Sequence, residues 1–215
     1  MSTEDTNRQE QLGGRLALLS SGEMSEDQRR LHDRVLAGRG AAAARSGYVA
    51  ALPDGRLIGP FNALLHAPDI AEHMLAWAAS IAGALESAGT DPVLRETVIL
   101  TVAARRQAAY ALYAHTQAAR RAGLSDRAVT AIVEGRTPDD LPPEALTAHR
   151  LARALADGTP VDDATYTEGT SRFGVAQLVG LVSLVGQYLT TCAVLACFDV
   201  PAPQQPNPVN PKEEP

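Results

Sequence analysis

Aromatic residues and cysteine are scarce in this chain of 215 residues, and its 19 lysine and arginine residues are outnumbered by 25 aspartate and glutamate residues. Aromatic residues make up 4% of it, which disfavours strand-rich folds, whereas alanine, leucine and arginine are abundant and favour helix. The formal net charge of -6 argues against a nucleic-acid or anionic-membrane partner, because such partners need clustered lysine and arginine in excess. The composition therefore predicts an all-α protein that binds neither nucleic acid nor membrane.

Only two cysteines occur, Cys192 and Cys197, and their spacing places them on different sides of a helix. Neither a disulfide nor a CxxC redox pair is predicted, and both are expected to be small buried side chains. The longest apolar stretch, 175–197, is interrupted by Gln177 and Gln187, so it is not expected to span a membrane. Because the N-terminus is polar and has no signal-peptide pattern, a cytoplasmic location is predicted.

No histidine, cysteine or acidic residues stand at spacings typical of metal ligands, and no glycine-rich phosphate loop follows a predicted strand. Neither a metal nor a cofactor is therefore predicted. Residues 1–24 are polar and are expected to be a flexible segment, and residues 201–215 are expected to be a disordered proline-rich tail. A single helical domain is predicted between them, at 25–200.

Start and stop signals divide this domain into a bundle of about eight helices. N-caps are expected at Ser25, Asp69, Asp91, Ser125 and either Asp162 or Asp163. Apolar residues of the segment 70–87 recur at three- and four-residue steps, which predicts one buried face made of Ile70, His73, Met74, Trp77 and Ile81. The last helix, 175–198, is apolar nearly all round and is expected to be central.

His115 stands in a helical stretch whose other residues are nearly all alanine, arginine or tyrosine. On a helical wheel it lies in a stripe of alanines, so it is either pinched between helices or faces a pocket. Tyr110 and Tyr113 fall on the opposite side and are expected at the surface or a subunit interface. A histidine on an apolar face is more often a packed core residue than a catalyst, and both interpretations stay open at this point.

Glu96 is the second candidate, because it lies on the apolar face of the preceding helix. Burying a carboxylate without a partner costs several kcal/mol. Arg95 is expected to point elsewhere, so an imidazole such as that of His115 is the favoured partner. In one straight helix the two residues would be about 28 Å apart. The pair therefore requires a chain reversal near residues 105–109, or two subunits, and no glycine or proline there forces a break.

The remaining histidines carry weaker predictions. His32 and His149 are expected on solvated faces, whereas His66 and His73 are expected either to line a cavity or to pack in the core.

Three quoted stretches resemble one known superfamily. The run RETVILTVAARRQAAYALYAHTQAARRAGLS follows GPFNALLHAP and precedes VAQLVGLVSLVGQYLTTCAVL. Together they resemble the carboxymuconolactone decarboxylase and alkyl hydroperoxidase D superfamily, over residues 28–198. The resemblance implies an all-helical fold and a homotrimer or hexamer, with the site between helices near the subunit contacts.

In the peroxidase branch, the family pattern is a glutamate, a CxxC pair and a histidine. Placed on Glu96, the pattern puts its cysteines at Ala108 and Ala111 and its histidine at His115. Without a thiolate, peroxidase activity is not expected. The sequence looks like the cysteine-free branch, which includes a decarboxylase of aromatic-compound breakdown.

The resemblance predicts a cofactor-independent lyase that acts on a small unsaturated carboxylic acid or lactone. His115 is the expected general acid/base and Glu96 orients it. A double-bond isomerase using the same pair and a non-catalytic oligomeric small-molecule-binding protein are the alternatives.

Five further residues are candidates for binding the substrate: Arg39, Arg45, Asn62, His66 and Tyr188. Arg39 and Arg45 would anchor a carboxylate, although a solvated surface position is an equal alternative for each. Asn62 and His66 follow Gly59-Pro60-Phe61 and would line the pocket. Tyr188 would supply a hydroxyl there or, more simply, would bond to the backbone.

Overall fold

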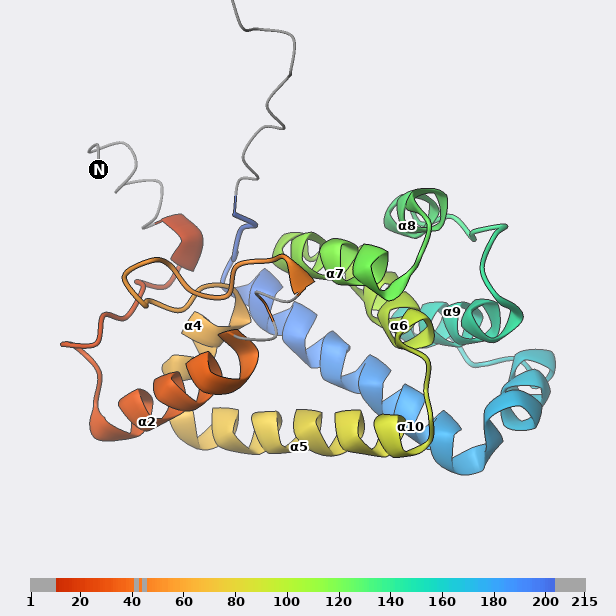
Figure 1. Cartoon of the computed structure of the whole chain (residues 1–215), viewed down its shortest axis with the longest axis horizontal. Helices are drawn as coiled ribbons and strands as arrows, with labels where there is room; N and C mark the ends of the chain where they lie inside the picture. Colours follow the sequence, from red (N-terminus) through yellow and green to blue (C-terminus); the bar gives the residue numbers. More distant parts are fainter. Residues whose placement is uncertain (1–10, 41–42, 44–45, 204–215) are drawn as a thin grey trace, which may run out of the picture.

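A computed structural model describes residues 11–40, 43 and 46–203 of the chain (Figure 1). Eight α-helices and no strand occur in this described part, which confirms the predicted all-α fold. A short 3-10 helix, η1 (Gln11–Gly13), and a short π-helix, η2 (Leu36–Gly40), lie near the N-terminus. The helices are α2 (Glu26–Val35), α4 (Pro60–Leu65), α5 (Pro68–Ser87), α6 (Pro92–Arg105), α7 (Ala109–Ala122), α8 (Asp126–Val133), α9 (Pro143–Ala156) and α10 (Asp163–Cys197).

Helix α10 crosses the middle of the molecule, with α5 on one side and α6 on the other (Figure 1). Val98 and Val102 of α6 are fully buried in the same core as Leu181 of α10. Gly180 lets α10 approach α5, since a Cβ there would lie 2.8 Å from Cδ2 of Leu85. These contacts fix the helices that surround the candidate site.

Side-chain caps start four of the eight described helices. Ser25 forms the predicted capping box with Gln28, and Asp91, Ser125 and Asp162 each accept a backbone N–H as predicted. The cap expected at Asp69 is wrong. Helix α5 begins at Pro68, because proline needs no amide partner in the first turn, and Asp69 is therefore already inside the helix.

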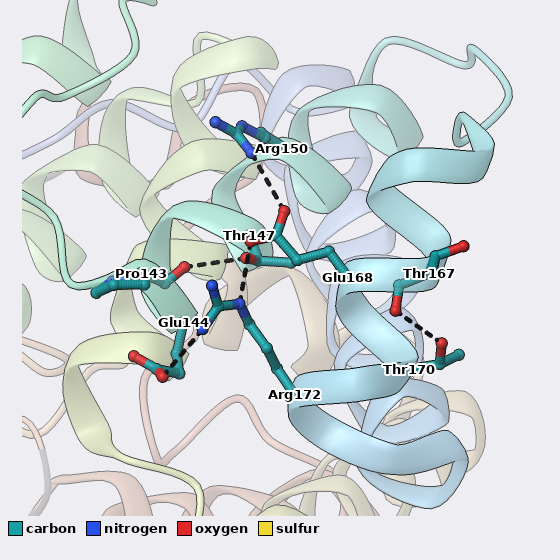
Figure 2. A network of polar contacts seen from close by, with 8 residues as sticks. All are labelled: Pro143, Glu144, Thr147, Arg150, Thr167, Glu168, Thr170 and Arg172. Atoms are coloured by element: carbon teal, nitrogen blue, oxygen red, sulfur yellow. Dashed lines mark hydrogen bonds and ion pairs between the residues drawn. The ribbon is translucent and has the colours of Figure 1, made fainter.

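A bend divides α10 at Gly174, where φ is 69° and ψ is 166°. The part before the bend is tied to α9 by a polar network, which Figure 2 shows. Glu168 pairs with Arg150 at 3.3 Å and with Arg172 at 3.0 Å, and Arg172 also reaches Glu144 at 3.3 Å. Exposed ion pairs contribute little stability each, so the network serves mainly to orient the first part of α10.

Two predicted packing faces are wrong in part. Helix α10 is not buried all round, since Val175 and Val179 are 66% and 59% exposed. On α5, Ile70 and Trp77 are exposed as well, and the buried face consists of Ala71, Ala78, Ile81 and Leu85. Two alanines and two larger residues thus share the buried face of α5, and Ile70 and Trp77 lie outside it.

By length and composition alone, α10 could cross a membrane. The glutamines within 175–197 therefore do not exclude a membrane span in the way that was expected from the sequence. The most apolar window of α10 is 28% buried in the described structure. Because the buried residues of α10 pack on α5, α6 and α9, the helix is also a core element of the fold. Val175, Val179 and Val182 of α10 remain exposed, and exposed apolar patches of this kind often mark a binding surface.

The expectations for the cysteines and two histidines need correction. Cys192 is buried as predicted, and burial raises the pKa of its thiol to about 11, although Arg106 acts in the opposite sense. Cys197 is exposed because it is the last residue of α10.

His32 and His149 are both buried rather than solvated. The Nε2 atom of His32 bonds to the carbonyl oxygen of Gly55 at 2.9 Å.

His149 lies between α9 and α6 with only one of its ring nitrogens paired. Its Nδ1 is 2.8 Å from Oγ1 of Thr101, whose hydroxyl already donates to the carbonyl oxygen of Thr97. The imidazole is therefore the donor at Nδ1, and Nε2 is a buried nitrogen without a partner among the described residues. Burial, followed by the charges of Arg153 and Arg150, lowers the pKa of His149 to about 4.

Acid is expected to destabilise the fold through His149. Its pKa is depressed in the folded state, so the unfolded chain takes up a proton near pH 6.5 while the folded chain resists until about pH 4. The free energy of unfolding should thus fall across this interval by up to about 3 kcal/mol. Denaturant unfolding of wild type and His149→Gln between pH 7 and pH 4 measures this loss. A stability difference between the two proteins that stays constant with pH would contradict the prediction.

Candidate active site

The chain reverses between α6 and α7, within the span where the sequence predicted a reversal or two subunits. Helix α6 ends at Arg105, Gln107 adopts a left-handed φ of 51°, and α7 begins at Ala109. A glutamine thus supplies the conformation usually given by glycine. The two helices pack together, so one subunit supplies both Glu96 and His115.

Glu96 and His115 form a direct pair. Nδ1 of His115 lies 2.8 Å from Oε2 of Glu96, whose side chain is 3% exposed. Arg95 donates to the other carboxylate oxygen at 2.9 Å, which corrects the expectation that it points elsewhere. An ionised carboxylate only accepts hydrogen bonds, so the proton in the pair belongs to Nδ1.

The surroundings keep this buried glutamate ionised. Burial acts to raise the pKa of Glu96, but the charge and hydrogen bond of His115 and those of Arg95 outweigh it. The pKa of Glu96 is lowered as a result. The carboxylate is therefore negatively charged at neutral pH, where it accepts the Nδ1 hydrogen bond and orients the imidazole.

Tyr188 of α10 completes the group. Its hydroxyl lies 3.0 Å from Nε2 of His115, and the two rings meet edge-on with their centroids 5.0 Å apart. The hydroxyl thus bonds to a catalytic candidate, which differs from the simpler expectation of a bond to the backbone. Arg95, Glu96, His115 and Tyr188 form one continuous line of polar contacts.

This line borders a cavity of about 240 Å³. Glu96, His115 and Tyr188 all line it, as predicted for residues of one site. The rest of the lining is mostly apolar and comes from α4, α5, α6, α7 and α10, with Phe61, Met74 and Trp77 among its larger members. A small molecule with an apolar body and one polar group to be protonated fits such a lining.

Two predicted pocket residues lie elsewhere. Asn62 is buried but holds the N-terminal segment: its side chain accepts the Leu19 N–H at 3.2 Å and donates to the carbonyl oxygen of Ala17 at 3.1 Å. His66 is exposed and does not line the cavity, because it follows the last residue of the short helix α4. Arg39 and Arg45, the predicted carboxylate anchors, lie outside the residues whose side chains the structure describes.

Two residues that line the cavity, Arg95 and Tyr110, were not predicted from the sequence. Arg95 lines the cavity and is the cation in contact with the Glu96 carboxylate. Tyr110 is buried instead of lying at the surface, and its hydroxyl donates to the carbonyl oxygen of Val49 at 2.7 Å. The N–H of Val49 donates in turn to the hydroxyl of Tyr113 at 3.1 Å. The tyrosines thereby fix the loop before α4 beside the cavity.

The signals for these two residues were present in the sequence. Arg95 directly precedes the buried glutamate, and Gly59-Pro60-Phe61 marks a position where a large ring can pack closely against the backbone.

Residues 68–154 match the model of the carboxymuconolactone decarboxylase family. Over this segment, which is less than half of its length, the chain is similar to that family. The segment contains Glu96, His115 and the turn between them, so the resemblance inferred from these residues is confirmed. The family is one of enzymes, decarboxylases or peroxidases.

A solved structure extends the comparison to most of the fold. It is the crystal structure of an alkylhydroperoxidase AhpD core, an uncharacterized peroxidase-related protein from Ralstonia eutropha JMP134. The two are 15% identical with a TM-score of 0.68, and the match covers 88% of this chain and 92% of that one. At this identity the match shows the shared helical fold alone. Among curated proteins, none matches the sequence significantly.

Proposed function

We propose that this carboxymuconolactone decarboxylase family protein is a cofactor-independent lyase for a small unsaturated carboxylic acid or lactone. The observation that carries the proposal is the buried Glu96–His115 pair, which contacts an apolar cavity. His115 acts as the general acid/base, and Glu96 fixes its tautomer and balances its charge. Decarboxylation leaves an electron pair that the conjugated carbonyl holds as an enolate, and the carbon next to this carbonyl then receives a proton.

The charge of Arg95 supports an acidic substrate. Its side chain is 46% exposed and lines the cavity while it bonds to Glu96. Guanidinium groups carry several donors, so one that holds a protein carboxylate can also meet a substrate carboxylate. In this proposal, Arg95 anchors the carboxylate of the substrate in the cavity.

Thiol peroxidase chemistry is less well supported by the same site. Ala108 and Ala111 stand where the peroxidase pattern has its cysteines. Cys192 and Cys197 do not line the cavity. No thiolate therefore stands beside His115 in the described part of the site, and a cysteine-free branch remains our assignment.

Turnover of carboxymuconolactone and related unsaturated lactone acids tests the proposal. Loss of the conjugated chromophore together with release of carbon dioxide is the expected result. A shifted double bond without carbon dioxide release would instead support an isomerase, because the same pair can remove and return a proton. A ligand that raises the melting temperature but is never converted would favour a binding protein.

Replacing Glu96 with glutamine should lower kcat by about 10- to 100-fold and leave the helical fold in place. Glutamine still accepts the Nδ1 hydrogen bond but carries no charge to stabilise the imidazolium. Steady-state kinetics on the converted substrate measure the loss. Glu86→Gln, an exposed change on α5, is the matched control. Wild-type kcat in Glu96→Gln would remove the carboxylate from the mechanism.

The same proposal includes a homo-oligomer, a trimer or hexamer. Its support is the uncovered apolar side chains of Val175, Val179, Ile70 and Trp77, since soluble monomers rarely expose large apolar patches. Trp77 also lines the cavity, which would place the site near the contact. Light scattering of the purified protein measures its oligomeric state, and a monomer at micromolar concentration would contradict an oligomer. A cytoplasmic location is part of the same proposal.

A further inference from the structure

Both ring nitrogens of His115 are already engaged. Glu96 holds Nδ1 at 2.8 Å, and the Tyr188 hydroxyl lies 3.0 Å from Nε2. When the imidazole is neutral, Nε2 accepts the Tyr188 proton, and when it is protonated, Nε2–H donates to the Tyr188 oxygen. In either state, the Tyr188 hydroxyl occupies Nε2, the ring nitrogen with which a substrate would otherwise exchange a proton.

We propose that the Tyr188 hydroxyl, and not the imidazole, exchanges the proton with the unsaturated acid or lactone. This rests on the proposed lyase function and makes Tyr188 a catalytic residue. His115 and Glu96 then become positioning residues that control the proton on Tyr188. The cavity is compatible with this role, because Tyr188 lines it together with Leu184 and Thr191 of the same helix.

The proton and electron balance of the step can be followed atom by atom. The bond to the substrate carboxylate breaks, carbon dioxide leaves, and the electron pair enters the conjugated carbonyl as an enolate. The enolate carbon takes the proton of the Tyr188 hydroxyl, whose oxygen takes the Nε2 proton of the His115 imidazolium. Glu96 retains the Nδ1–H hydrogen bond throughout, and the neutral imidazole regains one proton from solvent.

The ring geometry allows a clean test. Tyr188 meets His115 edge-on at an interplanar angle of 87°, and phenylalanine preserves this contact while it removes the oxygen. Tyr188→Phe should lower kcat by about 100-fold or more and change KM by less than about threefold. Tyr166→Phe is the matched control, because Tyr166 is exposed on the first part of α10.

Kinetics of the double variant separate a shared proton path from two independent effects. If Tyr188 and His115 act as one unit, Tyr188→Phe combined with His115→Gln should be no slower than the slower single variant. A raised KM with wild-type kcat in Tyr188→Phe would make the hydroxyl a binding group only. That result, or wild-type values of both constants, would overturn the proposal.

A second measurement needs no turnover. 2-Naphthol, a fluorescent mimic of a conjugated enol, should bind wild type and Tyr166→Phe at least tenfold more tightly than Tyr188→Phe. Equal binding by Tyr188→Phe, or no binding by wild type, would overturn the proposal. If naphthol binding depends on Tyr188 while no substrate is converted, the lyase function fails and the hydroxyl remains the group that meets the ligand.

Discussion

Substituting alanine for His115 is expected to lower kcat by about 10²- to 10⁴-fold, the range typical of a positioned general acid or base. The imidazole is the link between the Glu96 carboxylate and the Tyr188 hydroxyl, with contacts of 2.8 Å and 3.0 Å. Alanine breaks both contacts, so Tyr188 loses the imidazole that supplies its proton and Glu96 loses a hydrogen-bond donor. Steady-state kinetics on the converted lactone acid measure the effect.

The helical fold should survive this change at a moderate cost. Ala111, Ala114 and Ala118 already line the cavity on the same helix, so another alanine creates no clash. Glu96 keeps its hydrogen bond from Arg95 but loses the one from the imidazole, which lowers the free energy of unfolding by about 1–3 kcal/mol. Circular dichroism should therefore show a folded, somewhat less stable protein.

A glutamine at the same position separates catalysis from packing. The His115→Gln side chain retains an N–H donor for Glu96 but cannot exchange a proton near neutral pH. It should recover stability relative to His115→Ala while its kcat stays low. If both variants lose their helical signal, or if both keep wild-type kcat, then His115 is a core residue that takes no part in the proton transfer.

Substituting alanine for Gly59 is expected to give the largest loss of stability, about 3 kcal/mol or more in the free energy of unfolding. Gly59 has φ of 66° and ψ of -147°, a region that is essentially restricted to glycine. A Cβ there would lie 2.3 Å from Cζ of Tyr110, far inside van der Waals contact. Because Tyr110 lines the cavity, activity should fall as the ring is displaced.

A second glycine in the same loop provides the control. Gly55 also has a positive φ, 89°, but a Cβ added to it meets no atom within 4 Å. Gly55→Ala therefore carries backbone strain without a collision. Denaturant unfolding should show a clearly larger loss for Gly59→Ala than for Gly55→Ala. Equal losses would mean that the contact with Tyr110 contributes nothing.

The helices themselves could be predicted from local signals. Ser25, Asp91, Ser125 and Asp162 act as caps because a short polar side chain satisfies the free amides of the first turn wherever the helix packs. The non-helical backbone at Gly174 agrees with the expected start of the last helix near residue 175. The faces of α5 and α10 were not predictable in this way, since apolar periodicity does not reveal which apolar residues a partner covers.

The candidate site also combines features that the sequence predicted with contacts that only the packing of the helices decided. Chemical need alone linked Glu96 to His115, because a carboxylate on an apolar face requires a partner, and the family pattern placed both residues at matching positions. No local signal showed that Gln107 would turn the chain, since glutamine adopts a left-handed φ only where tertiary contacts stabilise it. The same holds for His149, whose burial depends on α6 packing over α9.

Residue types and spacing predicted the all-α fold and the Glu96–His115 pair, and the resemblance to a known family identified the alanines that stand in place of redox cysteines. These properties depend on helix propensity, on the cost of burying charge and on covalent chemistry, which are fixed by the residues themselves. The packing of α6, α7 and α10 decided that Arg95 contacts Glu96, that Tyr188 meets the imidazole and that Asn62 faces away. Contacts between distant segments depend on how helices cross, and no single helix specifies that.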